Sequence, residues 1–95
     1  MIIGFACKET QRIFRGEFSK KLPRDIQSSA GNKLVMLHAA VRIEDLRLPP
    51  SNHLEKLRGN RRGQWSIRIN RQWRLCLEWD EGANTASSVQ ILDYH

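Results

Sequence analysis

Residues 65–79, WSIRINRQWRLCLEW, decide the fold of this chain. Large apolar residues occupy every second position from Trp65 to Ile69 and again from Trp73 to Trp79. A period of two places alternate side chains on opposite faces of a β-strand, the pattern of a strand buried on one side. The polar segment 70–72 between the two runs suits a tight connection. The stretch therefore predicts two consecutive strands joined as a hairpin.

Further strands are predicted on both sides of this hairpin. Residues 80–84, DEGAN, are typical of a turn, and a last strand follows over Ser88–Tyr94, with Val89 and Ile91 as its apolar positions. Residues 53–57 supply one more short strand before the hairpin. The first eight residues, MIIGFACK, indicate a strand at the start of the chain.

Two helices are predicted between the first strand and the hairpin. Glu9–Phe14 suits a short helix that ends at Gly16 and has a basic polar side. A longer helix begins near Pro23, because proline has no N–H to leave unsatisfied at the first helical position. Steps of three and four residues join its apolar positions, which are Ile26, Ala30, Leu34, Leu37 and Val41.

Local details of the longer helix follow from its sequence. Gly31 lies within it and costs about 1 kcal/mol relative to alanine, so packing has to stabilise the helix. His38, beside the apolar stripe, is interpreted as a packing or surface histidine. Residues 43–46 add a turn, and the segment PPSN at 49–52 breaks the chain.

These elements predict the α+β class in a single domain over residues 1–95. The expected architecture is an antiparallel twisted sheet of four to five strands with two or three helices packed on one face. The longest apolar stretches are far shorter than the roughly 20 residues of a membrane helix. The N-terminus has neither the basic region nor the apolar core of a signal peptide, so a cytoplasmic location is predicted.

The cysteine and histidine spacing favours a protein without a metal or cofactor. Cys7 and Cys76 are far apart and are predicted to be buried free thiols. The three histidines show no zinc-site spacing. The net charge of +6 favours a polyanionic partner, either nucleic acid or an anionic lipid surface, although a solvated basic surface explains such a charge equally well.

The basic residues are concentrated in one segment. Residues 56–74 hold seven of the sixteen lysines and arginines and no acidic residue. These seven are Lys56, Arg58, Arg61, Arg62, Arg68, Arg71 and Arg74. Arginine forks match phosphate oxygens, and Gly59 and Gly63 allow the loop backbone to approach an anion. The cluster favours nucleic acid over the alternative of a solvated basic hairpin. Lys8, Arg12 and Arg15 form a smaller basic group on the short helix.

Three further features suggest chemistry near this segment. Arg74 lies on the strand face opposite the apolar side chains, in the middle of the predicted sheet. Glu55 is the carboxylate closest to the basic run. The chain stops at residues 93–95, Asp-Tyr-His, whose side chains transfer protons or bind phosphate. Each also has a plain explanation: a surface arginine, a charge-balancing glutamate and a frayed terminus.

The whole chain resembles the HigB-like branch of the RelE/ParE toxin superfamily. The resemblance is carried by residues 52–70, NHLEKLRGNRRGQWSIRIN, by QWRL at 72–75 and by the terminal DYH. It implies a compact RelE-like fold and a toxin of a type II toxin–antitoxin system. The implied activity is metal-free, ribosome-dependent cleavage of mRNA, in which the ribose 2′-OH attacks the adjacent phosphorus.

The resemblance also implies roles for individual residues. Arg74 matches an arginine that stabilises phosphate charge, and Glu55 matches a glutamate assigned as the base in the YoeB relatives. Arg58 falls on a basic position near the scissile bond. His53 is two residues short of the HigB histidine position, so no catalytic role is assigned to it.

The C-terminal residues complete the implied catalytic set. Tyr94 and His95 match a pair implicated in orientation and acid catalysis, and Asp93 completes the HigB-type ending. The general base stays open between Glu55 and His95. Lys56, Arg58, Arg61, Arg62, Arg68 and Arg71 are the expected RNA-binding residues.

The resemblance names partners and leaves two other functions open. It implies a HigA-like helix-turn-helix antitoxin, the ribosome and mRNA as partners, contact with operator DNA only through the antitoxin, and no membrane. The first alternative is a protein that binds ribosomes or ribosomal RNA without cutting. The second is a ParE-type gyrase inhibitor, which the presence of Glu55, Arg74 and His95 disfavours.

Overall fold

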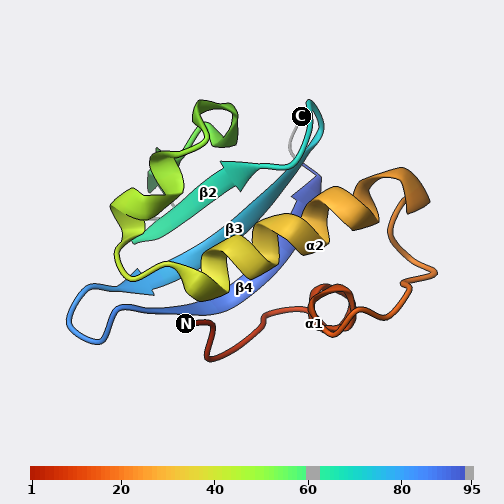
Figure 1. Ribbon diagram of the computed structural model, residues 1–95, viewed down its shortest axis with the longest axis horizontal. Helices are drawn as coiled ribbons and strands as arrows, with labels where there is room; N and C mark the ends of the chain where they lie inside the picture. Colours follow the sequence, from red (N-terminus) through yellow and green to blue (C-terminus); the bar gives the residue numbers. More distant parts are fainter. Residues whose placement is uncertain (60–62, 94–95) are drawn as a thin grey trace.

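The computed structural model describes residues 1–59 and 63–93, and it confirms the α+β class. Its four strands form one antiparallel sheet in the order β1-β2-β3-β4. The long helix α2 crosses one face of this sheet, and α1 lies beside β4 (Figure 1). The elements are α1 Lys8–Phe14, α2 Arg24–Ala39, the 3₁₀ helices η1 Ile43–Arg47 and η2 Pro50–Asn52, and the strands β1 Glu55–Lys56, β2 Gln64–Arg68, β3 Trp73–Asp80 and β4 Thr85–Asp93.

The predicted hairpin is confirmed as β2 and β3. Trp65 pairs with Leu77 and Ile67 with Leu75, so the apolar positions of both strands share a face. Asn70 organises the connection, because its side-chain oxygen accepts hydrogen bonds from two backbone N–H groups, at residues 72 and 73, each at 2.8 Å.

The core lies between this sheet and α2. Leu34 and Leu37 of the helix are fully buried, as are the β-strand residues Ile67 and Leu75. Gly31 of α2 faces α1: a Cβ at this position would lie 3.8 Å from Cγ2 of Ile13, an ordinary van der Waals contact. Packing of this kind stabilises a helix that contains a glycine.

The predicted apolar stripe is wrong at its last position, Val41. The helix ends at Ala39, and Val41 is 67% exposed. The backbone N–H groups of Val41 and Arg42 donate instead to the Asp45 carboxylate, at 2.9 and 3.0 Å, where η1 begins. These hydrogen bonds lower the pKa of the Asp45 carboxyl below its ordinary value, and the bond from Arg42 has the larger effect.

The predicted first strand is also wrong. The N-terminal segment makes only isolated parallel bridges to β4, Ile2 with Ala86 and Phe5 with Val89. Ser88, with a left-handed φ of 51°, lies between the two bridged positions of β4 and interrupts a continuous ladder. The strand predicted over 53–57 shrinks to the two residues of β1, while β4 starts at Thr85, three residues earlier than predicted.

Three smaller expectations can be compared with the structure. His38 is a surface residue, as expected: its Nδ1 accepts a hydrogen bond from the backbone N–H of Ile2 at 3.1 Å, and its ring packs 5.3 Å from that of Phe14. Cys76 is buried and free, whereas Cys7 is free but only partly buried. In the described part of the chain, no helix has the length and apolar character needed to cross a membrane.

Candidate active site

The candidate site lies on the sheet face that α2 does not cover. Arg68 of β2 pairs directly with Arg74 of β3, and both point away from the apolar face of Ile67 and Leu75. Like charges directly opposite each other destabilise a sheet. A fold that accepts this cost at the hairpin end of its two central strands concentrates positive charge at one point, as an anion-binding site requires.

The structure holds the Arg74 guanidinium in a fixed position. Its Nε donates to the Ser66 hydroxyl at 2.9 Å, and its Nη2 donates to the backbone carbonyl of His53 at 2.7 Å. Only 12% of the Arg74 side chain is exposed, so it is not the solvated surface arginine of the plain explanation. Two directed hydrogen bonds on one planar fork fix both its position and its orientation.

Glu55 lies beside this arginine. In the register of β1 and β2, Glu55 is opposite Ser66, which places it on the same face as Arg74. Its Oε2 lies 4.0 Å from Nη2 of Arg74. The Glu55 side chain is 59% exposed, so the carboxylate stays open to an incoming substrate. A carboxylate beside a fixed guanidinium can accept a proton next to bound phosphate.

A hollow of about 270 Å³ joins these groups. It is lined by His53, Glu55, Arg68, Asn70, Arg71 and Arg74. Arg68 is fixed within it, because its Nε donates to the Asn70 carbonyl at 3.1 Å. The hollow is therefore lined by three arginines, one glutamate and one histidine, residue types that phosphate binding and proton transfer require.

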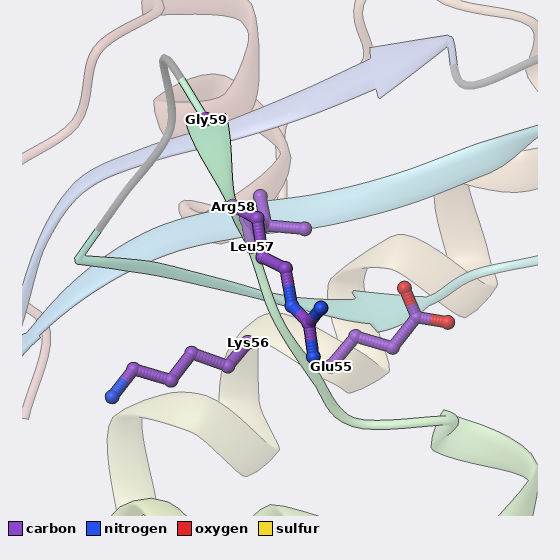
Figure 2. Close-up of a pocket in the computed structure, with 5 residues that line it drawn as sticks. All are labelled: Glu55, Lys56, Leu57, Arg58 and Gly59. Atoms are coloured by element: carbon purple, nitrogen blue, oxygen red, sulfur yellow. The ribbon is translucent and has the colours of Figure 1, made fainter.

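A second hollow, of about 670 Å³, extends along β1 and the residues after it. Its lining residues are Glu55, Lys56, Leu57, Arg58 and Gly59 (Figure 2). Glu55 and Lys56 extend to opposite sides of the strand in this view. The Lys56 ammonium lies 5.6 Å over the Trp65 ring, so the structure does not bring it to Arg74. Because Glu55 lines both hollows, Arg58 borders the same continuous surface as Arg74.

The remaining predicted residues have different outcomes. Asp93 of β4 pairs with Trp73 of β3, the residue before Arg74. Its Oδ2 accepts a hydrogen bond from Gln72 Nε2 at 2.9 Å. Alternation places Asp93 on the other face from Arg74, so the structure does not bring it into the hollow. Arg61, Arg62, Tyr94 and His95 lie outside the described residues.

Sequence reasoning missed three residues that build this site. Ser66 and the His53 carbonyl hold Arg74, and His53 is one of the residues that line the hollow. Buried Asn52 comes directly before His53, where the backbone adopts a left-handed φ of 45°. The available signals were weak: a serine in phase with Arg68 on β2, and an Asn-His pair after two prolines.

Asn52 attaches this segment to α2. Its amide nitrogen donates to the carbonyls of Leu46 at 3.0 Å and Leu48 at 3.3 Å, and its amide oxygen accepts from the Lys33 ammonium. The path from α2 through Asn52 to the His53 carbonyl therefore supports the guanidinium of Arg74. Among residues 1–59 and 63–93, no three His, Cys, Asp or Glu side chains gather in a way that could hold a metal ion.

Comparisons with known proteins agree with this geometry. Residues 4–95 match the family described as the RelE-like toxin of the type II toxin–antitoxin system HigB. The chain is 37% identical over 83 residues to Toxin HigB-1 of Vibrio cholerae, covering 86% of this chain and 87% of that one. It is also 37% identical over 80 residues to an uncharacterized protein of Haemophilus influenzae, covering 84% of this chain and 76% of that one.

A solved structure supports the fold independently. The RelBE2 toxin–antitoxin complex of Mycobacterium tuberculosis contains a chain that aligns with a TM-score of 0.53 at 20% identity, covering 100% of this chain and 96% of that one. At that identity the likeness concerns the fold alone. The family match over nearly the whole chain carries the assignment: this chain belongs to the HigB-like toxins, the RelE-like toxins of type II toxin–antitoxin systems.

Proposed function

We propose that this toxin is an endoribonuclease that cuts mRNA on the ribosome without a metal ion. The observation that carries the proposal is the fixed Arg74 guanidinium, held at 2.9 and 2.7 Å by Ser66 and the His53 carbonyl, with the Glu55 carboxylate 4.0 Å away. A preorganised cation stabilises charge that develops on a phosphate in the transition state. A nearby solvent-open carboxylate supplies the base.

The proposed reaction is an attack within the RNA chain. Glu55 takes the proton of the ribose 2′-OH, and the 2′-oxygen forms a bond to the adjacent phosphorus. Arg74, with Arg68 beside it, stabilises the extra negative charge of the phosphorane. The bond from phosphorus to the 5′-oxygen then breaks, and His95 donates a proton to that oxygen. The products are a 2′,3′-cyclic phosphate and a 5′-hydroxyl end.

The roles of Tyr94, His95 and Asp93 in this scheme come from the family resemblance. Tyr94 orients the substrate, and His95 is the acid in this scheme and the alternative base, with Asp93 completing the terminal group. Because the structure turns Asp93 away from Arg74, its proposed contribution is to hold the end of β4 through Gln72, 2.9 Å away.

The surrounding cations position the RNA. Phosphate contacts fix the register of a bound strand and carry no direct sequence information. The proposed RNA-binding residues are Lys56, Arg58, Arg61, Arg62, Arg68 and Arg71. Arg68 and Arg71 line the smaller hollow and Arg58 the larger one, so a strand lying across β1 can contact both.

The proposed partners follow from membership of the toxin family. A HigA-like helix-turn-helix antitoxin binds the toxin and carries the complex to operator DNA, and the ribosome presents the mRNA. The proposed location is the cytoplasm, where translating ribosomes are found.

Primer extension on ribosome-bound mRNA after brief induction of the toxin tests the proposal. Cuts within codons, with a 5′-hydroxyl on the downstream fragment, support it. Intact mRNA with impaired translation would identify a toxin that binds ribosomes without cutting. DNA damage with intact mRNA would identify a gyrase inhibitor of the ParE type. Either of these last two results overturns the proposed cleavage.

A further inference from the structure

A second basic surface lies on the segment that joins α1 to α2 (Figure 1), and its hollow shares no lining residue with the Arg74 hollow. Phe18 is at its centre and is 54% exposed. The guanidinium carbon of Arg24 lies over its ring, 5.4 Å from the centroid. We call this surface the Phe18 patch, and it consists of Arg12, Phe18, Lys20, Lys21 and Arg24. A hollow of about 340 Å³, lined by these residues other than Arg24 and by Glu9, lies within it.

The fold holds Phe18 outside in a fixed position. The next residue, Ser19, is fully buried: its N–H donates to Oε1 of Gln27 at 3.0 Å, and its carbonyl accepts from Nε2 of Gln27 at 2.7 Å. The Ser19 hydroxyl donates to Glu9 at 2.6 Å. Burial of an aromatic side chain stabilises a protein, and with Phe18 54% exposed this segment forgoes about half of that gain. An ordered backbone that presents an exposed ring is preorganised for a ligand.

The charges around the ring are unevenly neutralised. Arg12 lies 3.6 Å from both Glu9 and Glu17, so these two carboxylates are already paired. Within residues 1–59 and 63–93, neither the Lys20 nor the Lys21 ammonium has a carboxylate partner. The Phe18 patch therefore offers two unneutralised ammonium groups beside an aromatic face.

We propose that the Phe18 patch binds one unpaired RNA nucleotide, with the base stacked on the face of Phe18 that Arg24 does not cover and the flanking phosphates on Lys20 and Lys21. Aromatic faces surrounded by cations are the common means of binding single-stranded RNA, because every base has a π-face. A stable protein interface needs roughly 800 Å² per partner with an apolar centre, and a single ring among cations does not supply that. The inference rests on the proposed function in taking RNA as the polyanion.

The Phe18 patch gives the toxin a second RNA-binding site, separate from the site at which RNA is cut. The hollow of about 340 Å³ is at the small end of the range for ligand pockets, which suits one nucleotide. Contacts at two separate surfaces fix the orientation of the toxin on a large RNA assembly, whereas contacts at the Arg74 hollow alone hold it at one point.

The test measures binding of fluorescein-labelled octaadenylate to the full-length toxin by fluorescence anisotropy. All proteins carry Arg74→Ala, so no RNA is cut during the titration. Phe18→Ala and Phe18→Leu should each weaken binding about tenfold, because base stacking is worth about 1–3 kcal/mol per base. Phe18→Trp should keep the affinity. Val35→Ala removes a 61% exposed apolar side chain elsewhere on α2 and should change nothing.

The lysines give an independent measurement. Replacing Lys20 and Lys21 by glutamine should reduce the slope of log affinity against log salt by about 0.7 for each phosphate that the toxin no longer neutralises. Unchanged RNA affinity in Phe18→Ala, or full affinity in Phe18→Leu, overturns the proposal. Weaker co-purification with the antitoxin at unchanged RNA affinity overturns it too and assigns the patch to that protein. The unmodified toxin's failure to cut mRNA would refute only the proposed function, since this titration needs no cleavage.

Discussion

Replacing Arg74 by alanine should abolish growth arrest by the toxin. The substitution removes the cation that the structure fixes between Ser66 and the His53 carbonyl. Loss of one preorganised charge-stabilising group typically lowers the rate about 10²–10³-fold. Arg74→Lys keeps the charge, but an ammonium group cannot reproduce the planar fork that satisfies both partners at once. We therefore expect Arg74→Lys to retain only a small part of the activity.

The structure also gives the stability cost of this substitution. The hydrogen bonds from Nε to the Ser66 hydroxyl and from Nη2 to the His53 carbonyl disappear, and the buried Ser66 hydroxyl no longer has its charged partner. A net decrease of about 1–3 kcal/mol in the free energy of unfolding follows. The free energy of unfolding of small domains is about 5–15 kcal/mol, so the Arg74→Ala variant should remain folded and have a lower urea midpoint.

Growth after induction, primer extension and urea unfolding measure these effects together. Arg47→Ala is the matched control, because it removes an exposed arginine of η1 that does not line either hollow at the site. Growth arrest by Arg74→Ala at the protein level of the parent would refute the role given to this arginine. Loss of antitoxin co-purification would show instead that the variant had unfolded.

Four further outcomes are expected. Removing residues 94–95 should leave a folded toxin that co-purifies with its antitoxin but does not arrest growth, because a general acid contributes about 10²–10⁴ in rate; retained toxicity contradicts this. Gly31→Ala should raise the unfolding free energy by about 0.5–1 kcal/mol in urea melts, since the added Cβ meets only an ordinary contact; a lower value would indicate overpacking. The lowered pKa of Asp45 means that its ionised form stabilises the fold above about pH 4 and that this contribution disappears as pH falls through the folded-state pKa. Asp45→Asn should therefore show a shallower loss of stability in acid, and an unchanged acid profile counts against the capping role. Arg61→Glu combined with Arg62→Glu should weaken RNA binding and its salt dependence without changing which codons are cut; the same affinity at 50 and 200 mM salt (roughly the range over which phosphate contacts respond) contradicts the electrostatic account.

The fold was predictable where its determinants are local. The hairpin of residues 65–79 follows from a period of two, which every strand imposes on its own side chains. The prediction of an N-terminal strand was wrong because its pairing depends on β4, where the left-handed backbone of Ser88 lies between the two bridged positions. The prediction that Val41 continues the apolar stripe was wrong because the Asp45 carboxylate, four residues later, accepts hydrogen bonds from the backbone N–H groups after the helix end. Neither effect appears in a hydrophobic pattern.

The candidate site was predictable only in part, for a related reason. Arg74 and Glu55 stood out by residue type, position and family resemblance, and the structure places them 4.0 Å apart. Ser66 had only a weak sequence signal, because its role depends on the register that sets β2 against β3. The contribution of His53 to Arg74 comes from a carbonyl, which every residue has.

That carbonyl gives position 53 an unusual freedom. The hydrogen bond from Arg74 Nη2, at 2.7 Å, is accepted by the main-chain carbonyl of His53. It is therefore kept in any replacement at position 53 that keeps the left-handed backbone. Glycine, asparagine and aspartate adopt that conformation readily, whereas β-branched residues resist it. The contact with Arg74 therefore depends on the backbone shape at position 53, and the side chain there can vary while the arginine stays in place. A substitution at position 53 can thus change the chemistry of the wall of the hollow without rebuilding its charged centre.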